Sequence, residues 1–234
     1  MLDFTYHDIA KMIDHSLLQP ALTDQELEAG CRLAREYDVA SVCTKPYYLA
    51  RCAELLAGST VKAGTTIGFP HGGHTTRVKV FEAEQALDDG GKELDVVVNI
   101  GKVLSGDWSF VKTDIQAVVA ATHQRGQIVK VIFENCCLTD AQKIRLCEIC
   151  GEVGADFVKT STGYGDGGAT IDDLKLMRRH ALPHVAVKAA GGVRTLDKLL
   201  EVRALGVSRV GATRSAEILD DCRRRERQAL GDRL

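Results

Sequence analysis

The sequence lacks the features that mark membrane, secreted and nucleic-acid-binding proteins. No run approaches the roughly 18 apolar residues that a membrane-spanning helix needs, and a formal net charge of −2 gives no basic surface for nucleic acid. The first residues, Met1-Leu2-Asp3-Phe4, are acidic and short of apolar side chains, unlike a secretory signal peptide. We therefore expect a soluble cytoplasmic protein with no membrane or nucleic-acid partner.

Proline is also scarce, with 4 residues in 234, and none falls inside a predicted helix. The chain contains no low-complexity stretch and no linker that would separate two domains. Hydrophobic residues make up 45% and charged residues 26%, a balance typical of globular proteins. We expect one domain that spans residues 1–234.

Cysteine is the exception, because the chain has 8. Without an export signal, reduced thiols are favoured over disulfides. Cys147 and Cys150 form a C-x-x-C within a predicted helix at 139–153, just after Cys136 and Cys137. A four-cysteine zinc site is the alternative, but structural zinc usually takes such pairs from loops. We expect buried thiols and no metal.

Short apolar runs alternate with amphipathic helices along the whole chain. The predicted strands are 13–18, 39–43, 63–69, 94–100, 128–133, 157–160, 185–189 and 209–212. Most are rich in Val and Ile and apolar on both faces, as in parallel sheets covered by helices. No G-x-G-x-x-G follows an early strand, which disfavours a dinucleotide-binding fold. Eight strand–helix units in this length predict a closed (β/α)8 TIM barrel, an α/β fold.

The helices have recognisable start signals. Thr23 and Thr139 are each the first residue of a predicted capping box, and 107–122 places apolar residues along one helical face. A short helix is expected near residues 5–12 and a charged one near 214–230. The basic run at 223–227 is expected to be a solvated face of that last helix.

Three charged residues stand inside otherwise apolar strands: Asp95, Lys159 and Lys188. Buried charges are costly, so a purely structural ion-pair cluster is one explanation. A second lysine beside Lys159 would disfavour its protonation, and a free amine attacks carbonyls. The set therefore also fits imine chemistry, with Asp95 balancing charge and moving protons.

Three other residues are candidates for the same pocket. Lys130 lies in an apolar strand and could add a further charge partner. Asp14, in the first strand, and Cys43, at the end of the second, could also face the cavity. A structural hydrogen bond for Asp14 and a plain buried thiol for Cys43 are equally consistent with the sequence.

Glycine-rich segments follow the last three strands. Their candidate anion-binding residues are Gly163, Gly191, Gly192, Arg194, Gly211 and Thr213, with Arg214 as an alternative source of positive charge. Glycine lets backbone N–H groups approach an anion, and barrels often hold phosphate after strands seven and eight. The sequence favours a phosphate site here over simple tight turns.

A histidine pair, His71 and His74, follows Gly-Phe-Pro in a loop. A metal pair at this spacing is the alternative, but no third ligand is evident. Imine chemistry needs no metal and no organic cofactor. We expect loop hydrogen bonding.

Eight motifs together identify a family resemblance. They are IDHSLLQP at 13–20, SVC at 41–43, IGFP at 67–70, ELDVVVNIG at 93–101, VKVI at 129–132, GADFVKTSTG at 154–163, VKAAGGVR at 187–194 and RVG at 209–211. In this order they resemble the deoxyribose-phosphate aldolase family over nearly the whole chain. Two segments depart from its pattern: the loop containing His71 and His74, and Gly211-Ala-Thr-Arg-Ser215.

The resemblance implies a (β/α)8 barrel that reversibly cleaves 2-deoxy-D-ribose 5-phosphate to D-glyceraldehyde 3-phosphate and acetaldehyde. It places the Schiff-base lysine at Lys159, its proton-transfer partners at Lys188 and Asp95, and the phosphate loops at the glycines given above. It also implies a cytoplasmic homodimer or homotetramer without cofactor. Two rival functions are another Schiff-base sugar-phosphate lyase or transaldolase, and a non-catalytic sugar-phosphate-binding barrel.

Overall fold

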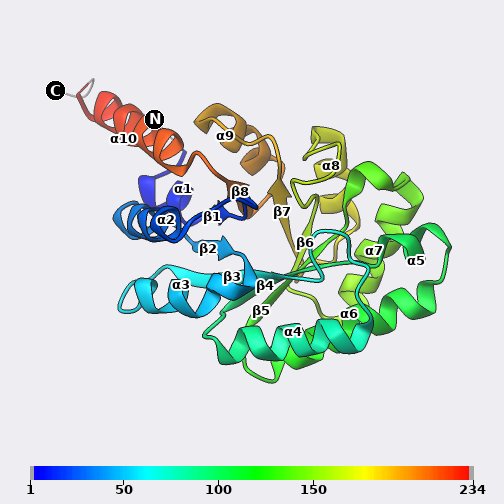
Figure 1. Ribbon diagram of the computed structural model, residues 1–234. Coiled ribbons are helices and arrows are strands. Elements are labelled where there is room, and N and C mark those ends of the chain that lie inside the picture. The colour runs from blue at the N-terminus through cyan, green and yellow to red at the C-terminus, as the bar shows by residue number, and fades with distance from the viewer. Residues whose placement is uncertain (1–2, 232–234) are drawn as a thin grey trace.

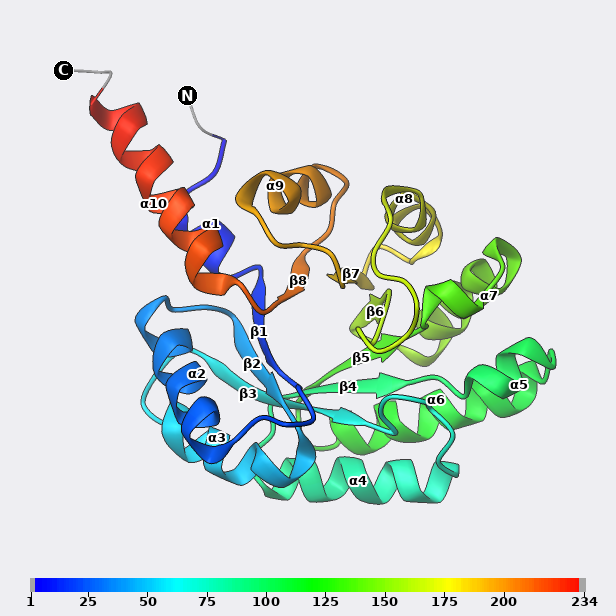
Figure 2. The same ribbon diagram turned by 45° about the horizontal axis from the view of Figure 1, so that its top comes forward.

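The strands form a closed parallel barrel in chain order, and this confirms the predicted fold class. The computed structural model describes residues 3–231. The strands are β1 Ile13–Leu17, β2 Ser41–Thr44, β3 Lys62–Ile67, β4 Glu93–Val97, β5 Ile128–Ile132, β6 Phe157–Lys159, β7 Ala186–Ala190 and β8 Arg209–Ala212. All eight predicted strands are present, with ends shifted by a few residues. Figures 1 and 2 show the helices arranged around this barrel.

The α-helices lie on the outside, mostly one after each strand. They are α1 Tyr6–Ala10, α2 Asp24–Glu36, α3 Leu49–Leu56, α4 Thr76–Asp88, α5 Ile100–Leu104, α6 Trp108–His123, α7 Asp140–Val153, α8 Ile171–His180, α9 Leu196–Ala204 and α10 Ser215–Gly231. Two 3-10 turns, η1 Pro46–Tyr48 and η2 Asn135–Cys137, follow β2 and β5. In the described part of the chain, no helix is both long and apolar enough to cross a bilayer.

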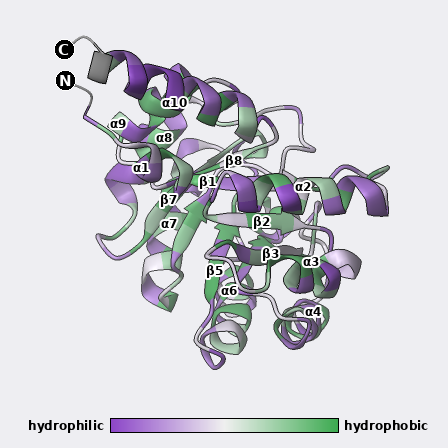
Figure 3. Ribbon diagram, turned by 90° about the vertical axis from the view of Figure 1, so that its left-hand side faces the viewer, coloured by the Kyte–Doolittle hydropathy of each residue, from purple (hydrophilic) through white to green (hydrophobic). Residues whose placement is uncertain are grey.

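Burial of the apolar strands against the helices accounts for this arrangement. Figure 3 shows hydrophobic strands inside and hydrophilic residues on the outer faces of the helices. The predicted capping boxes are present at Thr23 and Thr139, and each satisfies backbone N–H groups at a helix start. The predicted apolar face of α6 is also buried, at Val111, Ile115 and Val118.

Two strands end two or three residues earlier than the apolar runs predicted. β4 stops at Val97 because the Asn99 side chain accepts a hydrogen bond from the Lys102 N–H and starts α5, a helix that the pattern did not predict. β3 stops at Ile67 because Gly68 takes a left-handed conformation with φ +63°. Both ends turn the chain at the mouth of the barrel.

The basic run of α10 is only partly solvated, so that expectation was wrong in part. Figures 1 and 2 show α10 beside α1. The guanidinium of Arg223 lies 4.6 Å from the ring centre of Tyr6 and 4.8 Å from that of Tyr37. It also donates a 3.0 Å hydrogen bond to the Tyr6 hydroxyl. This stacking helps to hold the two ends of the chain together.

The predicted burial of Cys147 and Cys150 in α7 is confirmed. The expectation of buried thiols was wrong for Cys136 and Cys137, which lie outside that helix, in η2, and are exposed. Among residues 3–231, no group of three or more His, Cys, Asp or Glu side chains could hold a metal ion.

Candidate active site

The strand register gathers charged side chains in the barrel interior. Asp95 on β4 lies opposite Lys130 on β5, and Lys159 on β6 lies opposite Lys188 on β7. The connected charged residues are Asp14, Glu93, Asp95, Lys130, Lys159, Lys188 and Arg209. Sequence reasoning had selected all of these except Glu93 and Arg209. Both of those occupy the first position of their strands, where a charged residue is ordinary.

Asp95 is the junction of three lysines. Its Oδ2 atom lies 2.7 Å from Lys159 Nζ and 2.7 Å from Lys188 Nζ, and its Oδ1 atom lies 3.0 Å from Lys130 Nζ. Burial alone would raise the pKa of Asp95, but the three neighbouring lysines hold it well below the usual range. Asp95 is therefore ionised in the resting site.

A second set of ion pairs supports this junction. Lys188 lies 2.6 Å from Asp14 Oδ2, and Lys130 lies 2.7 Å from Glu93 Oε2. Arg209 pairs with Asp14 and lies 2.8 Å from Glu93 Oε1. The arrangement fixes each amine in place, because its hydrogen-bond partners are themselves held.

The three lysines differ in how many carboxylates they contact. Lys159 contacts Asp95, Lys188 contacts Asp14 and Asp95, and Lys130 contacts those two and Glu93. Burial lowers the pKa of Lys159, and Lys188 lowers it further against the opposing effect of Asp95. Burial would also lower the pKa of Lys188 and Lys130, but their carboxylates outweigh it and raise both. Lys159 is thus the lysine that most readily becomes a neutral amine.

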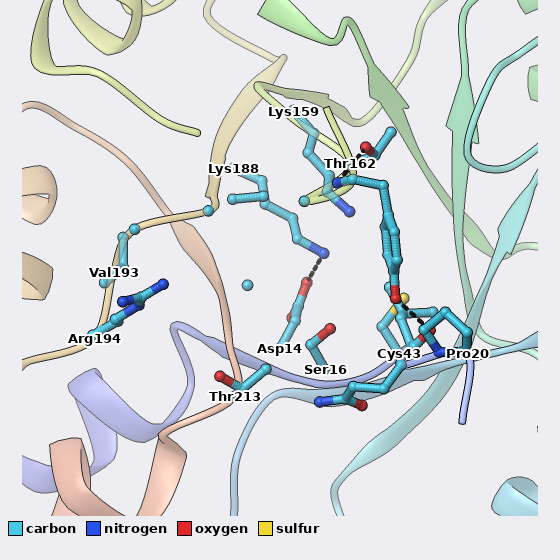
Figure 4. Close-up of a pocket in the computed structure, with 18 residues that line it drawn as sticks. Asp14, Ser16, Pro20, Cys43, Lys159, Thr162, Lys188, Val193, Arg194 and Thr213 are labelled. Atoms are coloured by element: carbon cyan, nitrogen blue, oxygen red, sulfur yellow. Dashed lines mark hydrogen bonds and ion pairs between the residues drawn. The ribbon is translucent and has the colours of Figure 1, made fainter. Parts of the chain in front are cut away.

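A cavity of about 420 Å³ opens above the network, at the carboxyl ends of the strands. Figure 4 shows the Lys188 amine beside Asp14, with Lys159 next to it. The predicted residues that line this cavity are Asp14, Cys43, Lys159, Gly163, Lys188, Gly191, Gly192, Arg194, Gly211 and Thr213. Asp95 and Lys130 are fully buried below the cavity. They influence it only through the lysine and aspartate side chains with which they pair.

The glycine-rich strand ends form one side of the cavity. Gly163, Gly191 and Gly192 all have positive φ angles, +88°, +80° and +97°. The Arg194 side chain and Thr213 lie on this side in Figure 4, across from Cys43 and Pro20. Arg214 does not line the cavity, so Arg194 is the better-placed cation.

Several lining residues escaped prediction. Ser16 follows Asp14 by two positions on β1 and so shares its face, a signal that strand periodicity could have supplied. Tyr164 directly follows Gly163, lines the cavity and donates a 2.6 Å hydrogen bond to the Leu18 carbonyl. Thr162 also lines it, and its backbone N–H donates to the buried Glu134 carboxylate at 3.2 Å.

The remaining candidates have local partners. Burial raises the pKa of the Cys43 thiol to about 11, and Asp95 adds to this, so Cys43 is a neutral thiol beside the lysines. His74 Nδ1 lies 3.2 Å from Glu82 Oε2, which also accepts the Gly68 N–H at 2.9 Å. The predicted loop hydrogen bonding is therefore confirmed for His74. His71 is exposed.

Comparisons with known proteins give one family. Residues 9–212 match the model of the DeoC/LacD family aldolases. The chain is 64% identical over 224 residues to a deoxyribose-phosphate aldolase of Rhodopirellula baltica, covering 96% of this chain and 93% of that one. It is 46% identical to one from Thermococcus gammatolerans, covering 94% and 98%. A tetrameric deoxyribose phosphate aldolase from Aeropyrum pernix superposes with a TM-score of 0.86 at 30% identity, covering 92% and 91%.

Proposed function

The chain belongs to the DeoC/LacD family of aldolases, and we propose that it reversibly cleaves 2-deoxy-D-ribose 5-phosphate to D-glyceraldehyde 3-phosphate and acetaldehyde. It is a class I aldolase, in which a lysine imine serves as the electron sink. The observation that carries the proposal is Lys159, a buried lysine of lowered pKa at the floor of the cavity. The family relatives supply the identity of the substrate.

Lys159 starts the reaction as a neutral amine. Its Nζ adds to the sugar aldehyde to give a carbinolamine, which loses water to form the imine. The bond between the carbon next to the imine and the hydroxyl-bearing carbon then breaks. Its electron pair moves into the imine and gives an enamine, and the hydroxyl proton leaves as glyceraldehyde 3-phosphate forms. Protonation of the enamine and hydrolysis release acetaldehyde and regenerate Lys159.

Lys188 and Asp95 move the protons. Lys188 lines the cavity and bonds to both Asp14 and Asp95, whereas Asp95 is covered by its lysine partners. Lys188, together with a water molecule, is therefore the member of the pair that meets the substrate hydroxyl. Asp95, buried below the cavity, accepts protons from Lys188 and gives them back. Its negative charge stabilises the cationic imine on Lys159.

The phosphate binds at the glycine-rich side of the cavity. Gly163, Gly191, Gly192 and Gly211 offer backbone N–H groups without the obstruction of a side chain, and Arg194 offers a positive charge. Thr213 adds a hydroxyl close to the start of α10, whose N-terminus favours an anion. The sugar phosphate thus spans the cavity from these loops to Lys159.

The test traps the intermediate. Incubation with deoxyribose 5-phosphate and borohydride should reduce the imine and add mass to the peptide that contains Lys159. Lys159→Leu should abolish both cleavage and trapping. An unmodified Lys159, with activity that survives its substitution, would overturn the assignment of the nucleophile.

A panel of phosphorylated sugars separates this function from its rivals. Trapping at Lys159 with another sugar phosphate, and none with deoxyribose 5-phosphate, would indicate a different Schiff-base lyase or transaldolase. Binding without trapping by any sugar would indicate a non-catalytic barrel. We further propose that the protein is a cytoplasmic homodimer or homotetramer, a state that size-exclusion chromatography with light scattering measures.

A further inference from the structure

Two adjacent cysteines lie exposed at the mouth of the barrel. Cys136 and Cys137 are the last two residues of η2, which follows β5 and the left-handed residue Glu134. Their Sγ atoms are 4.0 Å apart. No step of the aldolase reaction uses them, and they are separate from the buried pair Cys147 and Cys150 in α7.

The separation of the two sulfur atoms suits a single bridging atom. A single atom with bonds of about 2.3 Å to two sulfurs, at an angle between about 100° for pyramidal trivalent arsenic and the tetrahedral value, holds them about 3.5–3.8 Å apart. The observed 4.0 Å therefore requires only a small rotation of either side chain. We propose that Cys136 and Cys137 form a bidentate site for a thiophilic centre, with trivalent arsenicals as the matching ligand class.

The bridging reaction balances without any oxidant. An organoarsenic(III) oxide condenses with the two thiols, two S–H bonds and the arsenic–oxygen bond are broken, two arsenic–sulfur bonds form and one water leaves. Arsenic stays trivalent throughout. Exposure of both cysteines gives the reagent access, which a buried thiol does not have.

Occupation of this site should act on the active-site loop after β6. A methyl group placed on Gly165 would lie 3.0 Å from Cys136 Sγ, and one on Gly167 would lie 2.9 Å from Cys136 Cβ. The backbone at 165–167 therefore rests directly on Cys136. An arsenic atom bonded to that sulfur adds bulk beside this segment, and we expect the segment to shift.

The same segment continues into the cavity wall. Gly163 and Tyr164 line the cavity, and Thr162 is tied to Glu134, the residue that precedes the cysteine-containing turn. A displacement at 165–167 thus reaches the wall beside Lys159 within a few residues. We expect bound arsenical to lower aldolase activity by distorting this wall, an effect that rests on the proposed function.

The chain contains a matched control pair. Cys31 on α2 and Cys52 on α3 have Sγ atoms 3.7 Å apart, a spacing equally suited to bridging. Both are fully buried, so the reagent cannot reach them in the folded protein. Peptide mapping of the adduct therefore shows whether solvent access or the sulfur–sulfur distance decides where the arsenical binds.

The experiment treats the reduced full-length protein with phenylarsine oxide. We expect one arsenical per chain, with the mass of the reagent less one water, the loss of two titratable thiols, and an adduct mapped to Cys136 and Cys137. Cys136→Ser and Cys137→Ser should each lose the bridged adduct while keeping basal aldolase activity. A dithiol such as dithiothreitol should remove the arsenical, whereas an excess of a monothiol should not.

Binding and inhibition are scored separately. An adduct that persists in the Cys136→Ser/Cys137→Ser double variant, or that maps to Cys31 and Cys52, overturns the binding site. A bridged adduct that leaves kcat and KM unchanged overturns the coupling to the β6 loop. If the protein binds arsenical at this pair but never cleaves deoxyribose 5-phosphate, the proposed function fails and the site stands.

Discussion

The substitution Lys188→Met should raise the pKa of Lys159. Both Nζ atoms lie 2.7 Å from the same oxygen of Asp95, so they are no more than twice that distance apart. At an effective dielectric constant of about 20, two unit charges at this separation repel by about 3 kcal/mol. That energy corresponds to roughly 2 pKa units. Loss of Lys188 also leaves Asp95 freer to stabilise the Lys159 ammonium, which acts in the same direction.

The assay is kcat/KM as a function of pH, because its acid limb reports the free enzyme. The amine is the reactive form, so activity is present above the pKa of Lys159 and lost below it. In Lys188→Met the acid limb should move to higher pH by about 2 units, and the plateau should fall because a proton-transfer group is gone. Lys188→Arg keeps the charge and should lower the plateau without moving the limb. An acid limb that stays in place in Lys188→Met would refute the electrostatic argument.

Two stability predictions follow from buried features outside the cavity. The Lys79 ammonium lies 2.6 Å from Asp114, and both side chains are buried. Lys79→Met should therefore lower the free energy of unfolding, measured by urea titration, by about 3–5 kcal/mol. A loss below about 1 kcal/mol would show that Asp114 is easily neutralised or hydrated. Gly72 has φ +66°, and an added Cβ would lie 1.8 Å from the Val98 carbonyl oxygen, so Gly72→Ala should lower Tm clearly. Gly73→Ala meets open space and is the control; equal Tm values for the two variants would contradict the steric argument.

The sequence predicts the strands well because burial on both faces requires apolar runs. It predicts their ends less well, since β4 stops where the single side chain of Asn99 starts α5. An apolar run such as 94–100 contains no sign of that turn beyond one asparagine. A local pattern also cannot reveal contacts between distant parts of the chain. The stacking of Arg223 on Tyr6 joins opposite ends of the chain, so α10 was expected to be more solvated than it is.

The site was predicted in part, for a related reason. Charges inside apolar strands are conspicuous, so Asp95, Lys159 and Lys188 stand out in the sequence. Glu93 and Arg209 do not, because charged residues at strand ends are common and only barrel closure brings β4 and β8 within reach of each other. Cavity residues such as Tyr164 depend on the path of one loop, which no local pattern encodes.

Strand spacing alone could not decide between the strand lysines, but the charge balance of the described network supports Lys159 as the proposed nucleophile. Three carboxylates, Asp14, Glu93 and Asp95, face four cationic groups there, and an unbalanced charge in a buried site is costly. The network becomes neutral when one cation loses its proton. That cation is Lys159, because it contacts one carboxylate, which it shares, while Lys188 contacts two. Under the proposed function, these three carboxylates select the nucleophile, since they hold every other positive charge in place.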